Sequence, residues 1–461
     1  YVKRGIKFIM DEKIIIGKFL KNNYLVSPDI FESSFEIDQT IISLEKTFLE
    51  EKPIVITKDL VLSLGYLNKS IKAADLDNSR VLFEKGRKTD YINFIKEKEK
   101  KEVETSYLIK PNVKILRNYI KPEKKIIISD FVEYFKTRYK TLRETLLKRP
   151  ELQDAISINR VLAKKDKEVV SIIGLVISKK VTKNNNFIFE FEDLTGIVKV
   201  IIGKRDKELY SLCKETMLDE TLGVIGSFSK GVLFPKRIIF PDVPLTKELK
   251  KSPDDAYLIC TSDIHVGSRL FHREAFINFI NWLNGEVGDE SQIELSKQIK
   301  YLIITGDLVA GVGVYPNQDV DLEYKDINDQ YNELANLLKL IRKDIYIILC
   351  PGDHDAVMVN EPQPILDKEF AKAIYELENV VLVTNPSFVN IHSSENFSGF
   401  DCLLYHGHSF IYYADNIEKI RSNGWTARGD LIMKYLLQRR HLSPTHTATL
   451  YLPETSFDPL I

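Results

Sequence analysis

Five short apolar runs occupy the middle of the chain, and a polar amphipathic stretch separates the third from the fourth. The runs are EVVSIIGLVISKKV, FIFEFED, GIVKVII, TLGVIGSFSK and VLFPKRIIF, and the polar stretch is KRDKELYSLCKETM. Phe187, Phe189 and Phe191 alternate with Ile188 and Glu190. The three rings therefore lie on one face of a predicted strand.

Three strands, a helix and two more strands is the order of an OB-fold barrel. Barrels of this kind often bind single-stranded nucleic acid through exposed aromatic side chains among Lys and Arg. Here the aromatic positions alternate as core positions do. The pattern therefore favours a scaffold role over direct DNA binding, which stays the alternative.

One helix is predicted just before the barrel, so that a helix plus OB-fold domain spans residues 127–247. Ser129 or Asp130 is placed to cap it, and Pro150 follows its end. Apolar positions recur every three or four residues, at Phe131, Phe135, Tyr139, Leu142 and Leu146.

Two weaker segments precede this domain. Residues 1–65 alternate apolar runs with polar breaks, and we expect a small helical module there. Residues 66–126 are rich in Lys and Glu, as in FIKEKEKKEVETS, which predicts a charged flexible linker.

Strands alternate with helical patterns in the C-terminal part, which we assign to residues 250–461 after the boundary PDVPLTKELKKSPDD. The strands YLICTSD, YLIITGD, IYIILCPGD and CLLYHGH are almost wholly apolar before their polar ends. Such strands are buried on both faces, so the pattern predicts a layered α/β domain with helices covering a sheet.

Composition narrows the class of protein only slightly. The length of 461 residues predicts two or three domains, and 65 Lys and Arg against 66 Asp and Glu give a net charge of -1. A nucleic-acid partner would therefore have to bind a local basic patch. The four cysteines form no CxxC pair, and no apolar run reaches the roughly 18 to 20 residues that span a bilayer. We therefore expect a cytoplasmic protein without a membrane partner.

Polar clusters end four strands of the C-terminal domain, and all eight histidines lie after residue 260. Ligands of open α/β sheets bind outside the carboxyl ends of strands, so these clusters are expected to share one site. The clusters are Asp263-Ile264-His265, Gly306-Asp307, Gly352-Asp353-His354-Asp355 and His406-Gly407-His408.

These residue types predict a metal site. Asp263 and His265 offer an oxygen and a nitrogen from one loop, and Asp307 is suited to bridge two cations. Two cations about 3.5 to 4 Å apart can clamp a phosphodiester. Mixed carboxylate and imidazole ligands suit Mn, Fe or Zn better than Ca or Mg.

Each residue also has a simpler interpretation. A single Asp after a strand is more often a turn former or a helix cap. A lone histidine such as His272, His392 or His441 is more often a surface residue or a hydrogen-bonded core residue. The metal site is predicted because four strand ends carry ligand types together.

The order DIH, GD, GDHD and H closely resembles the signature of calcineurin-like metallophosphoesterases, in which GNHD is the usual third element and GHxH follows. The longer motifs SDIHVGSRLF, TGDLVAGVGVYPNQ, CPGDHDAVMVNEPQP, YHGHSF and LQRRHLSP resemble the small subunits of archaeal D-family DNA polymerases. With the barrel segment and IIFPDVP, the resemblance covers residues 125–461.

The resemblance implies a multidomain chain with an OB-fold barrel and a four-layer α/β metallophosphoesterase domain. It also implies a heterodimer with a large catalytic polymerase subunit, associated with the nucleoid. The expected activity is a 3′ to 5′ exonuclease that uses two divalent cations, Mn first, with Mg, Fe and Zn as alternatives. It would remove misincorporated nucleotides from single-stranded 3′ ends of DNA.

Carried over by position, the resemblance assigns the roles in the site. Its catalytic histidine is His354, beside the scissile phosphate, expected to stabilise developing charge or to protonate the leaving 3′ oxygen. Asp355 is expected to support the loop or to orient His354. The implied metal ligands are Asp263, His265, Asp307, Asp353 and His406.

The sequence departs from the family pattern twice. Asp353 stands where the family usually has Asn, and no GHxH occurs in the chain. His441 and His446 do not replace that motif, because RRHLSPTHT lacks its glycine and spacing. We expect a chain truncated before the motif, with a partial site and weak or absent exonuclease activity by itself.

A Gly-rich segment, LVAGVGVYPNQDVDLEY, follows Asp307. Gly311 and Tyr315 in this segment are candidate DNA contacts, and a surface loop without a ligand is the alternative.

Two other functions remain open. A catalytically inactive assembly subunit of the polymerase would be expected to lose several ligands, and the four clusters here keep their residue types. A small-molecule phosphodiesterase or phosphatase would explain the metal cluster but not the barrel before it.

Overall fold

In the computed structural model the chain divides into two compact units, Tyr1–Ser106 and Tyr107–Ile461. The structure describes residues 12–22, 24–26, 40–41, 44, 55–56, 110–121, 125–244, 248–454 and 457–461. Most of the predicted N-terminal module and of the predicted linker lies outside these residues. Both therefore stay predictions there.

The described part of the first unit is small. Helix α1 (Glu12–Lys21) precedes β1 (Leu25–Val26), which pairs in parallel with β2 (Val55–Ile56). Phe19 and Tyr24 are buried. This unit thus contains strand residues as well as helix.

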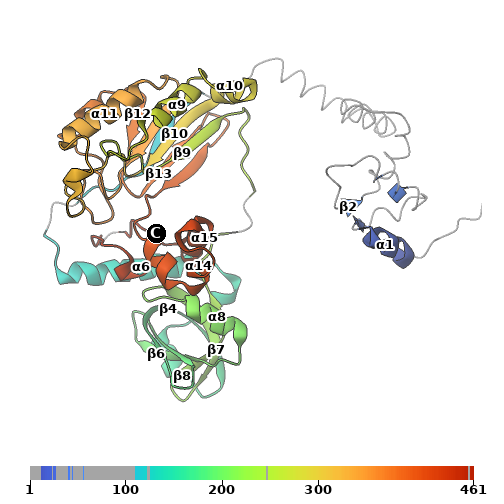
Figure 1. Cartoon of the computed structure of the whole chain (residues 1–461). Helices are drawn as coiled ribbons and strands as arrows, with labels where there is room; N and C mark the ends of the chain where they lie inside the picture. Colours follow the sequence, from blue (N-terminus) through green and yellow to red (C-terminus); the bar gives the residue numbers. More distant parts are fainter. Residues whose placement is uncertain are drawn as a thin grey trace, which may run out of the picture. The chain divides into compact units, whose positions relative to one another are not determined.

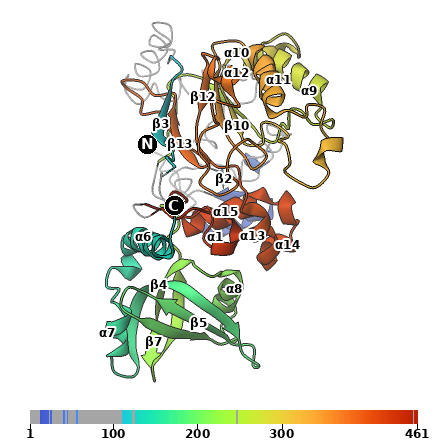
Figure 2. The same cartoon turned by 90° about the vertical axis from the view of Figure 1, so that its left-hand side faces the viewer.

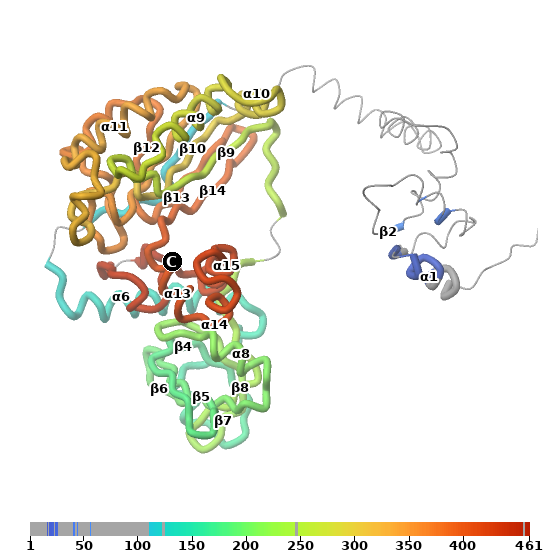
Figure 3. The backbone as a smooth tube through the Cα atoms, viewed as in Figure 1, coloured from blue at the N-terminus to red at the C-terminus, as the bar shows by residue number. Residues whose placement is uncertain are grey.

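The predicted five-stranded barrel is confirmed. Its strands close in the order β4-β5-β6-β8-β7 (Figures 1 and 3). Phe187, Phe189 and Phe191 are all at most 5% exposed, as their alternation predicted. The elements are β4 (Glu168–Val181), β5 (Phe187–Glu192), β6 (Ile197–Ile202), α8 (Lys207–Glu215), β7 (Thr221–Ser229) and β8 (Val232–Ile239), with α7 (Ile158–Leu162) before them.

Helix α6 (Ile128–Leu147) precedes the barrel and begins one residue earlier than the predicted cap at Ser129. The carboxylate of Asp130 instead accepts a hydrogen bond from the Ile127 N–H at 3.0 Å, inside the first turn. A short 3-10 helix, η2 (Pro150–Leu152), follows. Helix α6 buries the side chain of Arg138 completely, which the spacing of its apolar residues does not predict.

The C-terminal domain holds a parallel sheet of order β12-β11-β10-β9. Its strands are β9 (Tyr257–Thr261), β10 (Ile299–Thr305), β11 (Tyr346–Cys350) and β12 (Val380–Leu382). Figure 2 shows helices on one face of this sheet and a second sheet on the other. The helices are α9 (Arg273–Leu283), α10 (Glu290–Lys297), α11 (Ile327–Lys339) and α12 (Lys372–Tyr375).

Alternation along β10 explains these layers. Leu302 and Ile304 belong to the apolar core beneath the helices, whereas Tyr301 and Ile303 belong to the core between the two sheets. Successive strand residues point to opposite faces, so an apolar strand fills both cores. The described residues give two sheets and one helical layer, and the fourth layer stays a prediction.

The second sheet contains two strands that the sequence did not predict, β3 (Val113–Arg117) and β13 (Ser387–Ile391). Its order is β14-β13-β3, and β13 pairs antiparallel with β14 (Phe400–Leu404) and with β3. β3 lies within residues 66–126, the range predicted to be a flexible linker. Its partner lies far away in the chain, so no local pattern indicates the pairing.

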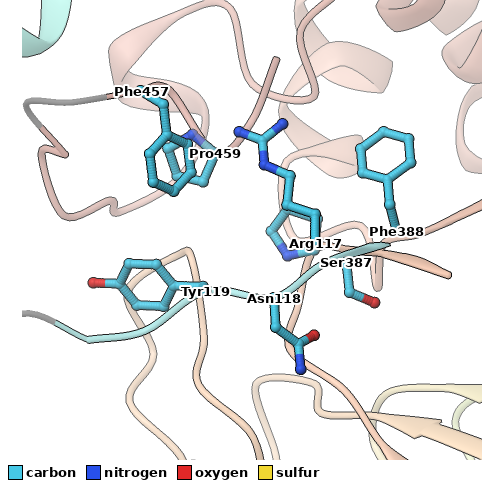
Figure 4. A pocket seen from close by; sticks show the side chains of 8 residues that line it. Arg117, Asn118, Tyr119, Ser387, Phe388, Phe457 and Pro459 are labelled. Atoms are coloured by element: carbon cyan, nitrogen blue, oxygen red, sulfur yellow. The ribbon is translucent and has the colours of Figure 1, made fainter. Parts of the chain in front are cut away.

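Arg117, at the end of β3, also contacts the last residues of the chain. Its guanidinium donates to the carbonyl oxygens of Asp458 at 2.8 Å and Ile461 at 3.2 Å. The same group lies 4.8 Å from the ring centroid of Phe457. Figure 4 shows Arg117 beside Phe457 and Pro459 in this small pocket. These contacts fix β3 in the second unit.

Three helices lie between the barrel and the two sheets: α13 (Phe410–Asn416), α14 (Glu418–Arg421) and α15 (Gly429–Arg439) (Figures 1 and 2). Tyr435 donates to the Glu215 carbonyl of the barrel at 3.0 Å, and Lys214 pairs with Glu418 at 3.0 Å.

Among the helices of the described ranges, none is both long enough and apolar enough to cross a membrane.

Candidate metal centre

The loop after β9 brings Asp263 and His265 to the carboxyl edge of the parallel sheet. Asp263 N–H donates to the Gly306 carbonyl at 3.1 Å, and His265 N–H donates to the Asp307 carbonyl at 3.0 Å. Asp263, His265 and Asp307 have φ values of 54°, 53° and 49°. Non-glycine residues adopt this left-handed region rarely, and such conformations gather at functional sites.

Asp307 lies at the centre of the cluster and is 5% exposed. Its Oδ2 lies 3.6 Å from His265 Nε2, and its Oδ1 lies 3.4 Å from His406 Nε2. Oδ1 also accepts the His354 N–H at 3.0 Å. The two carboxylate oxygens therefore face different histidines, which is the arrangement of a bridging ligand.

Two glycines allow this close approach. A Cβ atom on Gly352 would lie 2.3 Å from Asp307 Oδ1, and one on Gly306 would lie 2.3 Å from His406 Nδ1. Gly306 also has a φ of 86°, which favours glycine. The glycines of the GD and GDHD motifs are therefore required by the packing of the ligands.

His406 and Asp353 form the closest pair of the site, with Nε2 and Oδ1 3.0 Å apart. His406 Nδ1 lies 2.9 Å from the Thr305 carbonyl. A carbonyl only accepts, so Nδ1 carries the hydrogen and Nε2 faces the carboxylates. Burial lowers the pKa of His406, but the bond to Asp353 and the charge of Asp307 outweigh it and raise the pKa to about 9. Hydrogen bonds from His406 and His408 lower the pKa of Asp353.

Two buried amides that the sequence analysis missed hold this part of the site. Asn385 Oδ1 accepts the His406 N–H at 2.9 Å, and Asn385 Nδ2 donates to Gln363 Oε1 at 2.7 Å. Gln363 in turn donates to the Gly352 carbonyl at 3.2 Å. Gln363 lies in the motif CPGDHDAVMVNEPQP and Asn385 in none of the quoted motifs, so no ligand-type signal pointed to either.

His354 lies beside His265, with ring centroids 4.6 Å apart. Its Nδ1 lies 2.8 Å from the Ala310 carbonyl, so this nitrogen also carries the hydrogen. The predicted catalytic histidine therefore lies next to predicted ligands.

Asp355 is buried and supports the loop. Its Oδ2 accepts the N–H of Gly352 at 2.8 Å and of Leu308 at 3.2 Å, and Oδ1 accepts the Tyr331 hydroxyl at 3.1 Å. Burial raises the pKa of Asp355 to about 7. These contacts match loop support, one of the two expected roles, because none of them reaches the His354 ring.

Two groups of donors meet at Asp307. One contains His265, Asp307 and His354, the other Asp263, Asp307 and His406, and the ligand atoms within each group lie within 4.8 Å of one another. Imidazole nitrogens with carboxylate oxygens suit a borderline divalent cation. Nδ1 of His406 is bound to a carbonyl, as in most metal-binding histidines, so a cation bound at Nε2 would replace the hydrogen that Nε2 shares with Asp353. The residues present therefore fit divalent metal binding, with Asp307 common to both groups.

The other candidate residues lie outside the two donor groups. His392 binds Asp254 at 2.8 Å, and His441 binds Asp458 at 2.9 Å. Both are buried, hydrogen-bonded core histidines, in agreement with the simpler interpretation. Gly311 lies against His354, since its Cβ atom would be 2.2 Å from the His354 carbonyl oxygen. Tyr315 is 43% exposed and donates to Asp321 at 3.1 Å.

Comparison with known proteins gives one family and a set of named relatives. The calcineurin-like phosphoesterase family matches residues 257–457. The chain is 38% identical over 319 residues to the DNA polymerase II small subunit of Methanothermobacter thermautotrophicus, covering 69% of this chain and 63% of that protein. It is 41% identical over 324 residues to the same subunit of Pyrococcus furiosus, covering 70% and 51%.

The chain spans 51% to 63% of the length of these two relatives. Every implied ligand, and His354, falls inside the matched residues 257–457. The resemblance on which the motifs were interpreted is thus confirmed. The chain is a homologue of the DNA polymerase II small subunits and carries a calcineurin-like phosphoesterase domain.

Proposed function

We propose that this chain acts as the small subunit of a heterodimeric DNA polymerase and carries a metal-dependent 3′ to 5′ exonuclease. The observation that supports the activity is that the two oxygens of Asp307 face different histidines, with Oδ2 3.6 Å from His265 Nε2 and Oδ1 3.4 Å from His406 Nε2. Such a carboxylate can bridge two cations, and two cations at bridging distance can clamp a phosphodiester.

In this proposal Asp263, His265, Asp307, Asp353 and His406 hold two divalent cations, with Mn first because the ligands mix imidazole and carboxylate. Such cations, when bound, polarise a phosphodiester and lower the pKa of a water that attacks it. The backbone contacts of Asp263 and His265 keep these side chains oriented before substrate binds. That reduces the reorganisation needed during the reaction.

His354 is the proposed catalytic residue. Its Nδ1 is bound to the Ala310 carbonyl, which leaves Nε2 to face the scissile phosphate or the leaving 3′ oxygen. When the ring is protonated, Nε2 also carries a hydrogen and can donate it while the Nδ1 hydrogen stays on the Ala310 carbonyl. A proton donor positioned in this way typically contributes about 10²- to 10⁴-fold in rate.

The proposed partners are the large catalytic subunit and a single-stranded 3′ end of DNA. The name of the relatives supports the first, and the phosphodiester chemistry of the site supports the second. The exposed ring of Tyr315, in the loop that follows the metal-binding Asp307, is a candidate for stacking on a base.

The test is an assay of the full-length protein, with and without the large subunit, on 3′-labelled single-stranded DNA with Mn. We expect release of nucleotides from the 3′ end, reduced about 10²- to 10⁴-fold by His354→Ala and abolished by Asp307→Ala. His392→Gln is the matched control, because it removes a buried imidazole whose contacts are with Asp254 and Tyr301.

Two results would contradict the exonuclease. An inert wild-type complex that still assembles would favour the inactive assembly subunit. A protein that hydrolyses small phosphodiesters but does not bind the large subunit would favour a small-molecule phosphodiesterase or phosphatase.

A further inference from the structure

The peptide group between Ala310 and Gly311 is held on both sides by buried glutamines. The Ala310 carbonyl accepts a hydrogen bond from Gln318 Nε2 at 2.8 Å. The Gly311 N–H, on the other side of the same peptide plane, donates to Gln330 Oε1 at 2.9 Å. Gln318 and Gln330 are 4% and 0% exposed. One peptide group therefore has both of its polar atoms fixed by side-chain amides.

The same Ala310 carbonyl accepts the hydrogen of His354 Nδ1 at 2.8 Å. Its two lone pairs thus serve Gln318 and His354 together. A neutral imidazole carries its hydrogen on only one nitrogen, and the hydrogen bonds of the ring decide which one. A nitrogen that faces a carbonyl oxygen carries the hydrogen. The orientation of this peptide therefore decides where the hydrogen of His354 lies.

Because residue 311 is glycine, the Ala310–Gly311 peptide group could rotate into the opposite orientation. Gly311 has a φ of 74°, and no side chain fits there because a Cβ atom would lie 2.2 Å from the His354 carbonyl oxygen. A glycine permits the preceding peptide to turn over at little steric cost. A turned peptide would present the Gly311 N–H to His354, so Nδ1 would have to accept and the hydrogen would move to Nε2.

The two glutamines oppose this rotation with complementary atoms. Gln318 Oε1 accepts the Val314 N–H at 2.9 Å, which leaves Nε2 as the donor for Ala310. Gln330 Nε2 donates to the carbonyls of Gly311 at 3.1 Å and Tyr324 at 2.8 Å, which leaves Oε1 as the acceptor for the Gly311 N–H. Neither amide can turn without losing its other bonds.

We propose that Gln318 and Gln330 are positioning residues that lock the Ala310–Gly311 peptide. Through it they keep a hydrogen of His354 on Nδ1, so that Nε2 is the nitrogen that faces the substrate and, when the ring is protonated, donates to it. The catalytic use of this lock rests on the proposed exonuclease function. The lock itself is a property of the protein without metal or substrate.

The test is the position of the hydrogen on His354 in the metal-free, full-length protein with ¹⁵N-labelled histidine. His354 signals are assigned by comparison with His354→Ala. We expect the Nδ1–H form in the wild type. Gln318→Glu replaces the donor by an acceptor, which repels the Ala310 carbonyl, so we expect a shift to the Nε2–H form. Gln318→Met, which removes the bond without adding charge, should give a mixture of both forms.

Asn390→Ala is the control for a simple loss of stability. Asn390 is a buried amide on β13 that donates to the Ser398 carbonyl at 2.9 Å and to Asp401 at 2.7 Å. Its urea midpoint should fall as that of Gln318→Met does, while His354 keeps the wild-type form. If Gln318→Glu does not fold, the position of the His354 hydrogen in Gln318→Met tests the proposal by itself.

Activity gives a second measurement. In Gln318→Met we expect kcat to fall about 10- to 100-fold, the usual cost of losing an outer partner of a site residue, with KM unchanged. A wild-type His354 signal in both Gln318 variants would overturn the lock. A shifted His354 signal together with an inert wild-type enzyme would keep the lock and reject the exonuclease instead.

Discussion

Arg138 Nε lies 3.0 Å from Asp458 Oδ2, and neither side chain is exposed to solvent. The two residues are 320 positions apart, so the bond joins helix α6 to the last residues of the chain. Tyr134, Tyr451, His441 and the Pro444 carbonyl also form hydrogen bonds with this pair. A charge pair that is buried and fully hydrogen-bonded is costly to break from one side only.

The first prediction concerns this pair. Asp458→Asn or Arg138→Met should lower the free energy of unfolding by about 3 to 5 kcal/mol, because each leaves a buried charge without its partner. Urea denaturation measures the change, and Lys136→Met on the exposed face of α6 is the control. The double variant should cost less than the sum of the single ones, and strict additivity would contradict the coupling.

How much the sequence predicted depends on the range of the interactions. The barrel strands and the four clusters at strand ends follow from local alternation and turn residues, so Phe189 and Asp307 could be predicted. Arg138, strand β3 and the pair of Gln318 and Gln330 depend on contacts between distant segments or between side chain and backbone. Hydrophobic periodicity contains no information about such contacts.

The second prediction concerns pH. His441 Nε2 donates to Asp458, and Nδ1 accepts the Ser443 N–H at 2.9 Å, so the buried ring is neutral. Burial lowers the pKa of His441 to about 4. Since the unfolded chain has a histidine pKa near 6.5, it binds more protons below that pH. The contribution of His441 to stability is therefore complete above pH 6.5 and is lost as the pH falls towards 4.

His441→Gln isolates this contribution, because glutamine does not titrate. The contributions of the other titrating groups to the unfolding free energy cancel when the two proteins are compared. The difference in unfolding free energy between wild type and variant should change by on the order of 3 kcal/mol between pH 7.5 and pH 4. Urea denaturation across that range measures it. The same pH dependence in both proteins would mean that the pKa of His441 does not differ between the folded and the unfolded chain.

The third prediction concerns the glycine beside the bridging carboxylate. Gly352→Ala should displace Asp307, because the new Cβ atom would lie 2.3 Å from Oδ1 and 2.4 Å from the Asp307 N. We expect Mn affinity, measured by calorimetry, to fall at least about 10-fold. Gly429→Ala is the matched control, since no atom lies within 4 Å of its added Cβ. Unchanged Mn affinity in Gly352→Ala would remove Asp307 from the metal site.

The fourth prediction concerns Asp353, an anion where the resembling family usually has an amide. Asn keeps one acceptor oxygen for a cation and reduces the repulsion of a phosphate. Asp353→Asn should therefore preserve or increase nuclease activity in the complex with the large subunit. Asp353→Ala, which removes the oxygen donor, should reduce activity about 10- to 100-fold. A complete loss of activity in Asp353→Asn would show that this position is misassigned.

The fifth prediction concerns the loop after Asp307. If the ring of Tyr315 stacks on a base, Tyr315→Ala should weaken binding of single-stranded DNA by about 1 to 3 kcal/mol, the usual contribution of one aromatic stack. Tyr315→Phe keeps the ring and removes only the hydrogen bond to Asp321, so it should bind nearly as the wild type does. Fluorescence anisotropy with Asp307→Ala as the common background measures binding without cleavage. Equal affinity in Tyr315→Ala and Tyr315→Phe would leave the loop as a surface segment whose buried Gln318 serves His354 alone.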